Sequence, residues 1–122
     1  MSVYIIAEGG VNHNGDYQKA FELIDIASSA NADAIKFQTF LTENLVTRFA
    51  ETANYQKKSA SNETQFEMLK KLELPKGIHF ELFDYAKEKS IDFMTTAFDS
   101  DSLKFIVNDL GLTKLKISSG DI

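Results

Sequence analysis

The sequence contains no cysteine, no tryptophan and only one proline among its 122 residues. Without cysteine the chain forms no disulfide, no zinc–thiolate site and no thiol nucleophile, which fits a reducing compartment. No apolar run approaches the ~20 residues that a membrane-spanning helix requires. The first eight residues lack the basic start of a secretory signal. We therefore expect a cytoplasmic protein with no membrane partner.

Positively charged residues are fewer than negatively charged ones: the sequence has 13 Lys and Arg and 18 Asp and Glu, which gives a net charge of −5. This balance argues against a nucleic-acid partner, since such proteins need a basic surface. The two histidines stand far apart, with no carboxylate at a ligand spacing, so no metal site is predicted within the chain. We expect His13 to be solvated or hydrogen-bonded within its loop, and His79 to lie on the surface at the start of a helix.

Short apolar segments alternate with helical stripes along the chain. We predict strands at 3–7, 34–39, 91–97 and 115–118, and helices near 17–27, 66–72, 78–89 and 103–110. This order predicts parallel strands joined by right-handed crossovers, with helices covering the sheet.

The alternation within the predicted strands distinguishes two architectures of the α/β class. In 34–39, Lys36 and Gln38 share one face while Ile35 and Phe37 share the other. An open sheet covered on both faces is expected to have continuously apolar strands. We therefore favour part of a TIM (β/α)8 barrel, whose inner top carries polar residues, over an open doubly wound sheet. A complete barrel takes ~250 residues, so about four βα units correspond to half of one.

Polar side chains follow each predicted strand, where the ends of parallel strands meet at one rim. They are Glu8, then Lys36 and Gln38, then Thr95 and Thr96, and finally Lys116, Ser118 and Ser119. A buried lysine is costly unless an anion or a carboxylate compensates it, so two lysines with hydroxyl groups predict a site for a phosphate or a carboxylate. Each residue also has a simpler interpretation. Glu8 would only pair with Lys36, Lys116 would extend to solvent, and the threonines would be ordinary strand residues.

Several segments resemble, in order and spacing, the sialic acid synthase family. They are IIAEGGVNHNGDYQKAFELID (5–25), ADAIKFQTFLTENLVT (32–47), YQKK (55–58), QFEMLKKLEL (65–74), DFMTTAFDSDS (92–102) and LKISSGDI (115–122). The resemblance implies the N-terminal half of a TIM barrel that condenses phosphoenolpyruvate with an open-chain N-acylated amino sugar and releases phosphate. It also implies a divalent metal, Mn or Mg, as cofactor of the full-length enzyme.

The resemblance also implies roles for particular residues. Lys36, Thr96, Lys116 and Ser119 match binders of phosphoenolpyruvate, whereas Glu8 and Gln38 match catalytic groups beside the sugar aldehyde. The family's metal-binding histidines, in the later barrel half, and its antifreeze-like domain have no counterpart here. We therefore expect residues 1–122 to form one incomplete domain without synthase activity of its own. The chain departs from the family at Asn31 and Ser90, where glycine is usual, and at Ala97, where proline is usual.

Two other functions stay open. A non-catalytic half-barrel would serve as an anion-binding or assembly module, because unpaired sheet edges and an apolar interior favour a homodimer or other self-association. An open α/β sheet of unrelated function would bind no phosphoenolpyruvate and would not depend on Lys36 or Lys116. The identity of the amino sugar is not predicted.

Overall fold

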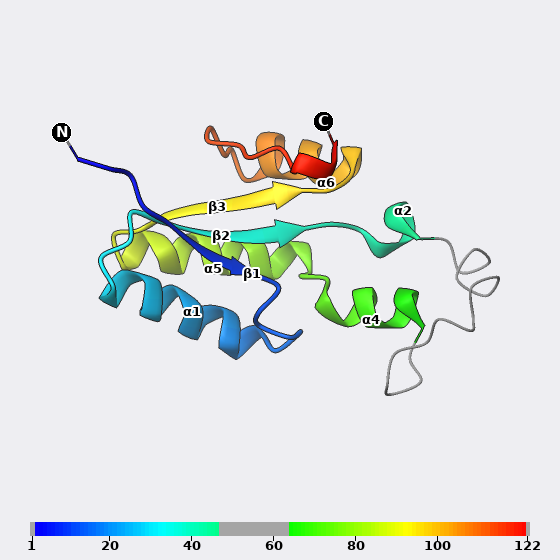
Figure 1. Cartoon of the computed structure of the whole chain (residues 1–122), viewed down its shortest axis with the longest axis horizontal. Helices are drawn as coiled ribbons and strands as arrows, with labels where there is room; N and C mark the ends of the chain where they lie inside the picture. The colour runs from blue at the N-terminus through cyan, green and yellow to red at the C-terminus, as the bar shows by residue number, and fades with distance from the viewer. Residues whose placement is uncertain (1, 47–63, 122) are drawn as a thin grey trace.

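The computed structural model describes residues 2–46 and 64–121, so the YQKK segment lies outside the described residues. A three-stranded parallel sheet forms its centre, in the order β1 (Ile6–Gly10), β2 (Ala34–Thr39) and β3 (Asp92–Ala97). All three arrows in Figure 1 point the same way. The carboxyl ends of the strands therefore meet at one edge of the sheet, as predicted.

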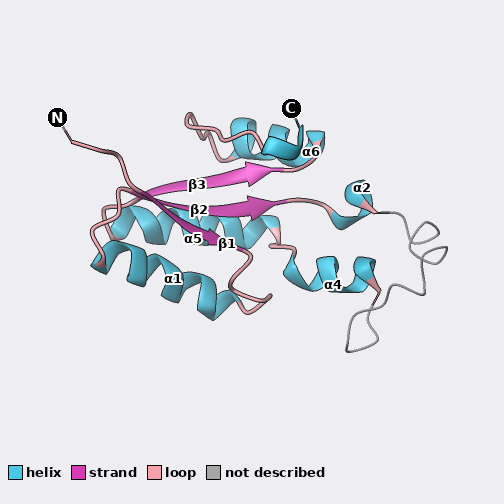
Figure 2. Cartoon of the chain, viewed as in Figure 1, coloured by secondary structure: helices cyan, strands magenta, loops and turns pink. Residues whose placement is uncertain are grey.

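Helices cover one face of this sheet. The longest are α1 (Tyr17–Ser29) and α5 (Lys76–Glu88); in Figure 2, α1 runs below the strands and α5 lies partly behind β1 and β2. Short helices α2 (Thr42–Leu45) and α4 (Gln65–Leu72) lie beyond the end of β2, and α6 (Ser100–Lys104) continues into the π-helical turn η1 (Phe105–Asp109). A 3-10 turn, η2 (Ser119–Asp121), ends the described chain.

Helix α1 shows how local sequence determines these elements. The Asp16 side chain caps the helix by accepting hydrogen bonds from the backbone N–H groups of Gln18 and Lys19. Ala20, Ile24 and Ala27 then recur at the spacing of one helix face, and all three are buried. The other buried apolar side chains that share this core are Ile35, Phe37, Leu74, Leu82, Ala86, Ile91, Phe93, Phe105, Ile106, Leu110 and Leu112.

The sheet is apolar on the helix side and polar on the other side, as the alternation in 34–39 predicts. Ile35 and Phe37 point into the core, so Lys36 and Gln38 lie on the opposite face. In β3, Phe93 packs into the core while Thr96 takes the opposite face with Lys36, to which it is hydrogen-bonded. This parallel arrangement belongs to the α/β class, as expected.

Two strand predictions were wrong. Residues 115–118 form no strand in the described structure, and the sheet ends at β3. Leu115 and Ile117 are 47 % and 70 % exposed. Backbone hydrogen bonds to β3 alone, without burial of these side chains, would not offset the conformational entropy lost on ordering the segment. The first strand begins at Ile6 rather than at residue 3 and extends to Gly10 rather than to residue 7.

Candidate functional site

A buried lysine lies at the carboxyl end of the sheet, between a carboxylate and a hydroxyl group. Lys36 Nζ is 2.8 Å from Glu8 Oε2 and donates a hydrogen bond of 3.4 Å to Thr96 Oγ1. The parallel register brings them together, because Glu8 is opposite Lys36 and the next strand places Thr96 opposite Gln38. Lys36 is 8 % exposed and Thr96 is 1 % exposed, whereas the Glu8 side chain is 55 % exposed. The cation is therefore inside, and its carboxylate partner faces solvent.

A β-bulge directs Glu8 toward this lysine. Glu8 pairs with Lys36 but Gly10 pairs with Phe37, so Gly9 is an extra residue in β1. A Cβ atom on Gly9 would lie 2.9 Å from the fully buried Phe37 ring, and Gly10 has a φ of +52°. The Gly10 N–H in turn donates to Glu8 Oε1 at 3.0 Å. Both glycines are thus required by the geometry that holds the carboxylate.

Gln38 completes the group on this face of the sheet. It is half-buried, and a Cβ atom added to Gly10 would lie 3.8 Å from Gln38 Nε2 and 3.7 Å from Glu8 Oε1. The amide and the carboxylate therefore border the same small space. We call Glu8, Lys36, Gln38 and Thr96 the strand-end cluster; it contains a cation, a carboxylate, an amide and a hydroxyl.

The remaining predicted site residues lie apart from this cluster. Lys116 is exposed and lines a hollow of about 470 Å³ together with Ala97, Phe98 and Asp99, which follow Thr96 along the chain. Ser119 is exposed in η2. Within residues 2–46 and 64–121, neither side chain forms a hydrogen bond or an ion pair with the strand-end cluster. Their separation follows from the missing fourth strand, which would have aligned residues 115–118 with β3.

Asp99 accepts several hydrogen bonds at this end of the sheet, and its role was not predicted from the sequence. Its carboxylate accepts hydrogen bonds from the Leu41 and Ser102 backbone N–H groups, and from the Ser102 and Asn44 side chains. Burial alone would raise the pKa of Asp99, but these hydrogen bonds together lower it. The signal was the sequence Asp-Ser-Asp-Ser, which resembles a helix N-cap. Asp99 ties the loop after β2 to the loop after β3.

Both histidines are buried, which corrects the predicted surface position of His79. His13 is 0 % exposed and its Nδ1 accepts the Gly15 N–H at 3.0 Å, whereas His79 is 1 % exposed. Burial lowers the pKa of both rings, and for His79 this effect outweighs the hydrogen bond to the Pro75 carbonyl group, which raises the pKa. His79 does lie in the first turn of helix α5, as expected. Its ring packs against the ring of Phe105, with the two centroids 5.2 Å apart.

The described residues do not fit the divalent metal that the family resemblance implies. No group of three or more His, Asp or Glu side chains lies close enough to hold an ion in the described part of the chain. Both Glu8 oxygens already have partners, Gly10 N–H and Lys36. These residues therefore are not assigned a role as metal ligands.

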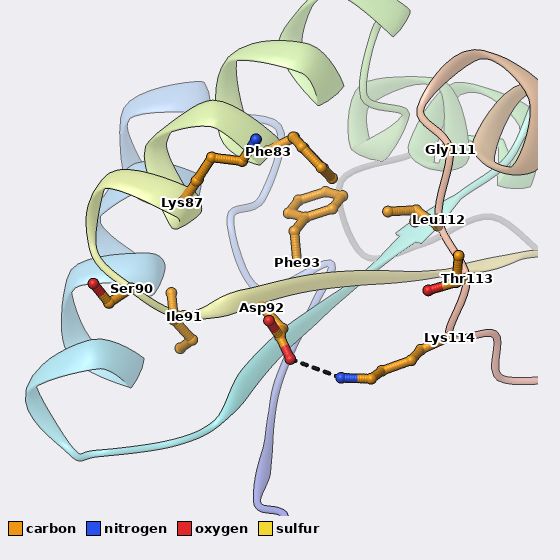
Figure 3. A pocket seen from close by; sticks show the side chains of 10 residues that line it. All are labelled: Phe83, Lys87, Ser90, Ile91, Asp92, Phe93, Gly111, Leu112, Thr113 and Lys114. Atoms are coloured by element: carbon orange, nitrogen blue, oxygen red, sulfur yellow. Dashed lines mark hydrogen bonds and ion pairs between the residues drawn. The ribbon is translucent and has the colours of Figure 1, made fainter.

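A second hollow, of about 440 Å³, lies at the opposite end of the sheet, where β3 begins (Figure 3). Its charged groups are already engaged. Asp92 pairs with Lys114 at 2.9 Å, and Lys87 lies over the Phe83 ring at 5.4 Å from its centroid. It is bordered by the turn that contains Ser90. This hollow lies away from the strand-end cluster, so we do not include it in the candidate site.

None of the helices in the described ranges is both long enough and apolar enough to cross a membrane.

Comparison with known proteins supports the sequence resemblance. The chain is 50 % identical to N,N'-diacetyllegionaminic acid synthase of Legionella pneumophila over its whole length, and 34 % identical to human N-acetylneuraminate-9-phosphate synthase over 97 % of it. It covers 34 % and 33 % of these proteins, so it spans about a third of their length. Among solved structures, the sialic acid synthetase of Leptospira borgpetersenii, determined in complex with citrate, matches with a TM-score of 0.77 and 34 % identity, over 99 % of this chain and 38 % of that one. A sequence model described as the NeuB family matches residues 23–122. The chain therefore belongs to the NeuB family.

Proposed function

We propose that this chain forms the phosphoenolpyruvate-binding part of a synthase that condenses phosphoenolpyruvate with an N-acylated amino sugar, giving N-acetylneuraminate or a related nonulosonic acid. The observation that carries the proposal is the buried Lys36 between Glu8 and Thr96 at the carboxyl ends of parallel strands. Substrate sites of barrel enzymes form at this end of the strands. Relatives named as legionaminic acid and N-acetylneuraminate-9-phosphate synthases support the reaction class.

The cluster has the groups needed to hold an anion. The Lys36 ammonium group supplies a fixed positive charge, and its burial strengthens the attraction for a phosphate or a carboxylate. Thr96 accepts a hydrogen bond from Lys36, so its own hydroxyl proton is free to donate to the ligand. Binding at these positions would orient phosphoenolpyruvate before the sugar arrives.

Glu8 has two tasks in this proposal. In the absence of ligand its carboxylate compensates the charge of Lys36. When a bound anion pairs with Lys36 in place of Glu8, the Glu8 carboxylate becomes available. Glu8 and Gln38 border the adjoining space, where they can form a hydrogen bond to a sugar oxygen and Glu8 can exchange a proton with it. Because Glu8 is half-exposed, water can solvate its carboxylate when an anion replaces it beside Lys36.

Two more residues that the proposal assigns to the substrate site, Lys116 and Ser119, lie apart from the strand-end cluster in this structure. Lys116 and Ser119 would reach the phosphoenolpyruvate if residues 115–118 aligned with β3 as the fourth strand of a TIM barrel. The sugar-binding groups and the Mn or Mg ligands would come from outside the described residues. In this proposal the protein acts in the cytoplasm.

Titration of phosphoenolpyruvate into the 122-residue chain, followed by phosphorus NMR, tests the proposal. We expect the ligand signals to broaden and shift, and we expect inorganic phosphate or citrate to compete. Release of phosphate from phosphoenolpyruvate, Mn²⁺ and N-acetylmannosamine should not occur with this chain alone. An unchanged ligand spectrum, or steady turnover by the chain, would contradict the proposal.

An assembly module is the second candidate, and the exposed edges of the sheet favour it. Val3, Ile5 and Ile117 are 76 %, 52 % and 70 % exposed, next to strand edges that have no partner in the described structure. Such edges pair readily with another chain. Light scattering should then detect a dimer or larger species, whereas a monomer at high concentration would argue against this function.

A further inference from the structure

A chain of hydrogen bonds lies behind the strand-end cluster, on the core side of the sheet. Thr39 Oγ1 is 2.7 Å from Thr95 Oγ1 and 2.8 Å from His79 Nε2. His79 Nδ1 is 2.8 Å from the carbonyl oxygen of Pro75. All three side chains are at least 96 % buried. These contacts connect the ends of β2 and β3 to the first turn of α5.

The positions of the protons follow from the acceptor at one end. The Pro75 carbonyl oxygen can only accept, so His79 Nδ1 carries a hydrogen, and because burial lowers the pKa of the ring, the ring is neutral and Nε2 carries a lone pair. Thr39 must then donate its single hydroxyl proton to Nε2, and Thr95 must donate to Thr39. The ring has to be neutral for this arrangement, which agrees with its burial among Phe105 and the sheet.

The network is directly behind the residues proposed to bind substrate. Thr39 follows Gln38 along β2, and Thr95 precedes Thr96 along β3. Neighbouring residues of a strand point to opposite faces, so each threonine shares its backbone with a cluster residue on the other face. Any shift of Thr39 or Thr95 therefore moves Gln38 or Thr96.

We propose that His79 is a positioning residue for the strand-end cluster. Its neutral ring, through Thr39 and Thr95, sets the relative placement of the ends of β2 and β3 and hence of Gln38 and Thr96. This inference rests on the proposed function for its consequence in binding. The hydrogen-bond chain itself is measurable without any ligand.

The two histidines of the chain permit an internal control for the tautomer. His13 Nδ1 accepts the Gly15 N–H, so the His13 hydrogen is on Nε2, the reverse of His79. Nitrogen-15 NMR of the labelled chain at neutral pH should show a protonated Nδ1 for one ring and a protonated Nε2 for the other. The variant His79→Gln assigns the signals. A His79 ring protonated on Nε2, or on both nitrogens, would overturn the inference.

Three variants test the positioning role. His79→Phe removes both hydrogen bonds, Thr39→Val removes the shared hydroxyl at nearly constant volume, and His79→Gln keeps an acceptor for Thr39. Titration with phosphoenolpyruvate should show at least about tenfold weaker binding for the first two variants and recovery of most of the affinity for His79→Gln. Gly77→Ala, on the same helix with no atom within 4 Å of the added Cβ, should bind like the wild type.

Amide hydrogen exchange separates this inference from the proposed function. His79→Phe and Thr39→Val should raise exchange at the ends of β2 and β3 and shift the Gln38 and Thr96 amide signals, with Ile24 in α1 unchanged. If the wild type binds no phosphoenolpyruvate but these local changes occur, the proposed function fails and the positioning role stands. Wild-type affinity in both variants, or exchange that rises equally in α1 and at the strand ends, would overturn the positioning role.

Discussion

Glu8 and Lys36 face each other in the register of β1 and β2, with Oε2 and Nζ 2.8 Å apart. The lysine side chain is 10 % exposed and the glutamate side chain is 55 % exposed. The pair is therefore asymmetric, because a solvated carboxylate compensates a buried cation. This asymmetry allows an incoming anion to replace the carboxylate without leaving a buried negative charge.

The first prediction concerns the substitution Glu8→Gln. It removes the charge that competes for Lys36, so binding of inorganic phosphate should become several-fold tighter, measured by calorimetric titration. The free energy of unfolding should fall by about 1 kcal/mol, since a buried lysine loses its partner but the lost partner is half-exposed. Weaker phosphate binding by this variant would show that Glu8 contributes to the anion site rather than occupying it.

The second prediction concerns Gly15, where the loop after β1 packs against the carbonyl group of Lys71. An added Cβ would collide with that oxygen, and the φ of Gly15 is +81°. Gly15→Ala should therefore lower the free energy of unfolding by at least about 2 kcal/mol in urea denaturation. The matched control, Gly77→Ala in helix α5, should raise it by roughly 0.5 kcal/mol. Equal effects of the two substitutions would contradict this contact.

The third prediction concerns the left-handed residues before β2 and β3. Asn31 has a φ of +62° and Ser90 a φ of +59°. Serine tolerates this region less well than asparagine, so Ser90→Gly should stabilise the chain by about 1 kcal/mol and Asn31→Gly by less. Thermal denaturation measures both. A lower melting temperature for Ser90→Gly would mean that the serine side chain makes a compensating contact.

The fourth prediction concerns the pH dependence of stability. Burial lowers the pKa of His13 and His79, so below about pH 6.5 the unfolded chain binds protons that the folded chain does not. The free energy of unfolding should therefore fall with decreasing pH, by up to about 1.4 kcal/mol per pH unit for each histidine. The pKa of Asp92, lowered by hydrogen bonds from Tyr4 and Lys114, matters only below about pH 4.

Urea denaturation between pH 7.5 and 5 measures this slope. His79→Gln should reduce it, because one titrating ring is removed. A stability that does not change over this pH range would contradict the burial of the two neutral rings.

Regular alternation made part of the fold predictable from sequence. The bounds of β2 agree with the predicted strand 34–39, in which Ile35, Lys36, Phe37 and Gln38 alternate between apolar and polar. The end of β3 at Ala97 also agrees with the predicted strand 91–97, and α1 overlaps the helix predicted near 17–27. In these segments the local pattern and the tertiary packing agree.

The errors occurred where local sequence permits two structures. Gly9 and Gly10 are typical of a turn, but the packing of the Phe37 ring against Gly9 makes them a bulge within β1. The position of His79 near the start of a helix indicates a surface location, which is wrong. Its spacing from Leu82 and Ala86 matches the buried face of α5 and could have located it correctly.

The candidate site was predictable only as far as parallel strand ends bring residues together. Glu8, Lys36, Gln38 and Thr96 meet because the strand register, together with the bulge after Glu8, places them on one face. Lys116 would join the cluster only through a fourth strand. Such a strand requires other residues to bury Leu115 and Ile117, and the strand pattern of the sequence does not supply them. The roles of all these residues in substrate binding and catalysis remain predictions.

The central claim is that Lys36 holds phosphoenolpyruvate, and calorimetric titration of the Lys36→Met chain tests it most directly. Methionine keeps most of the buried apolar stem of the side chain and removes the ammonium group, with its charge and its hydrogen bonds to Glu8 and Thr96. Lys114→Met is the matched control, because Lys114 pairs with Asp92 at 2.9 Å at the opposite end of the sheet. We predict that phosphoenolpyruvate binds to the wild type and to Lys114→Met but not to Lys36→Met. Undiminished binding by Lys36→Met would contradict the claim.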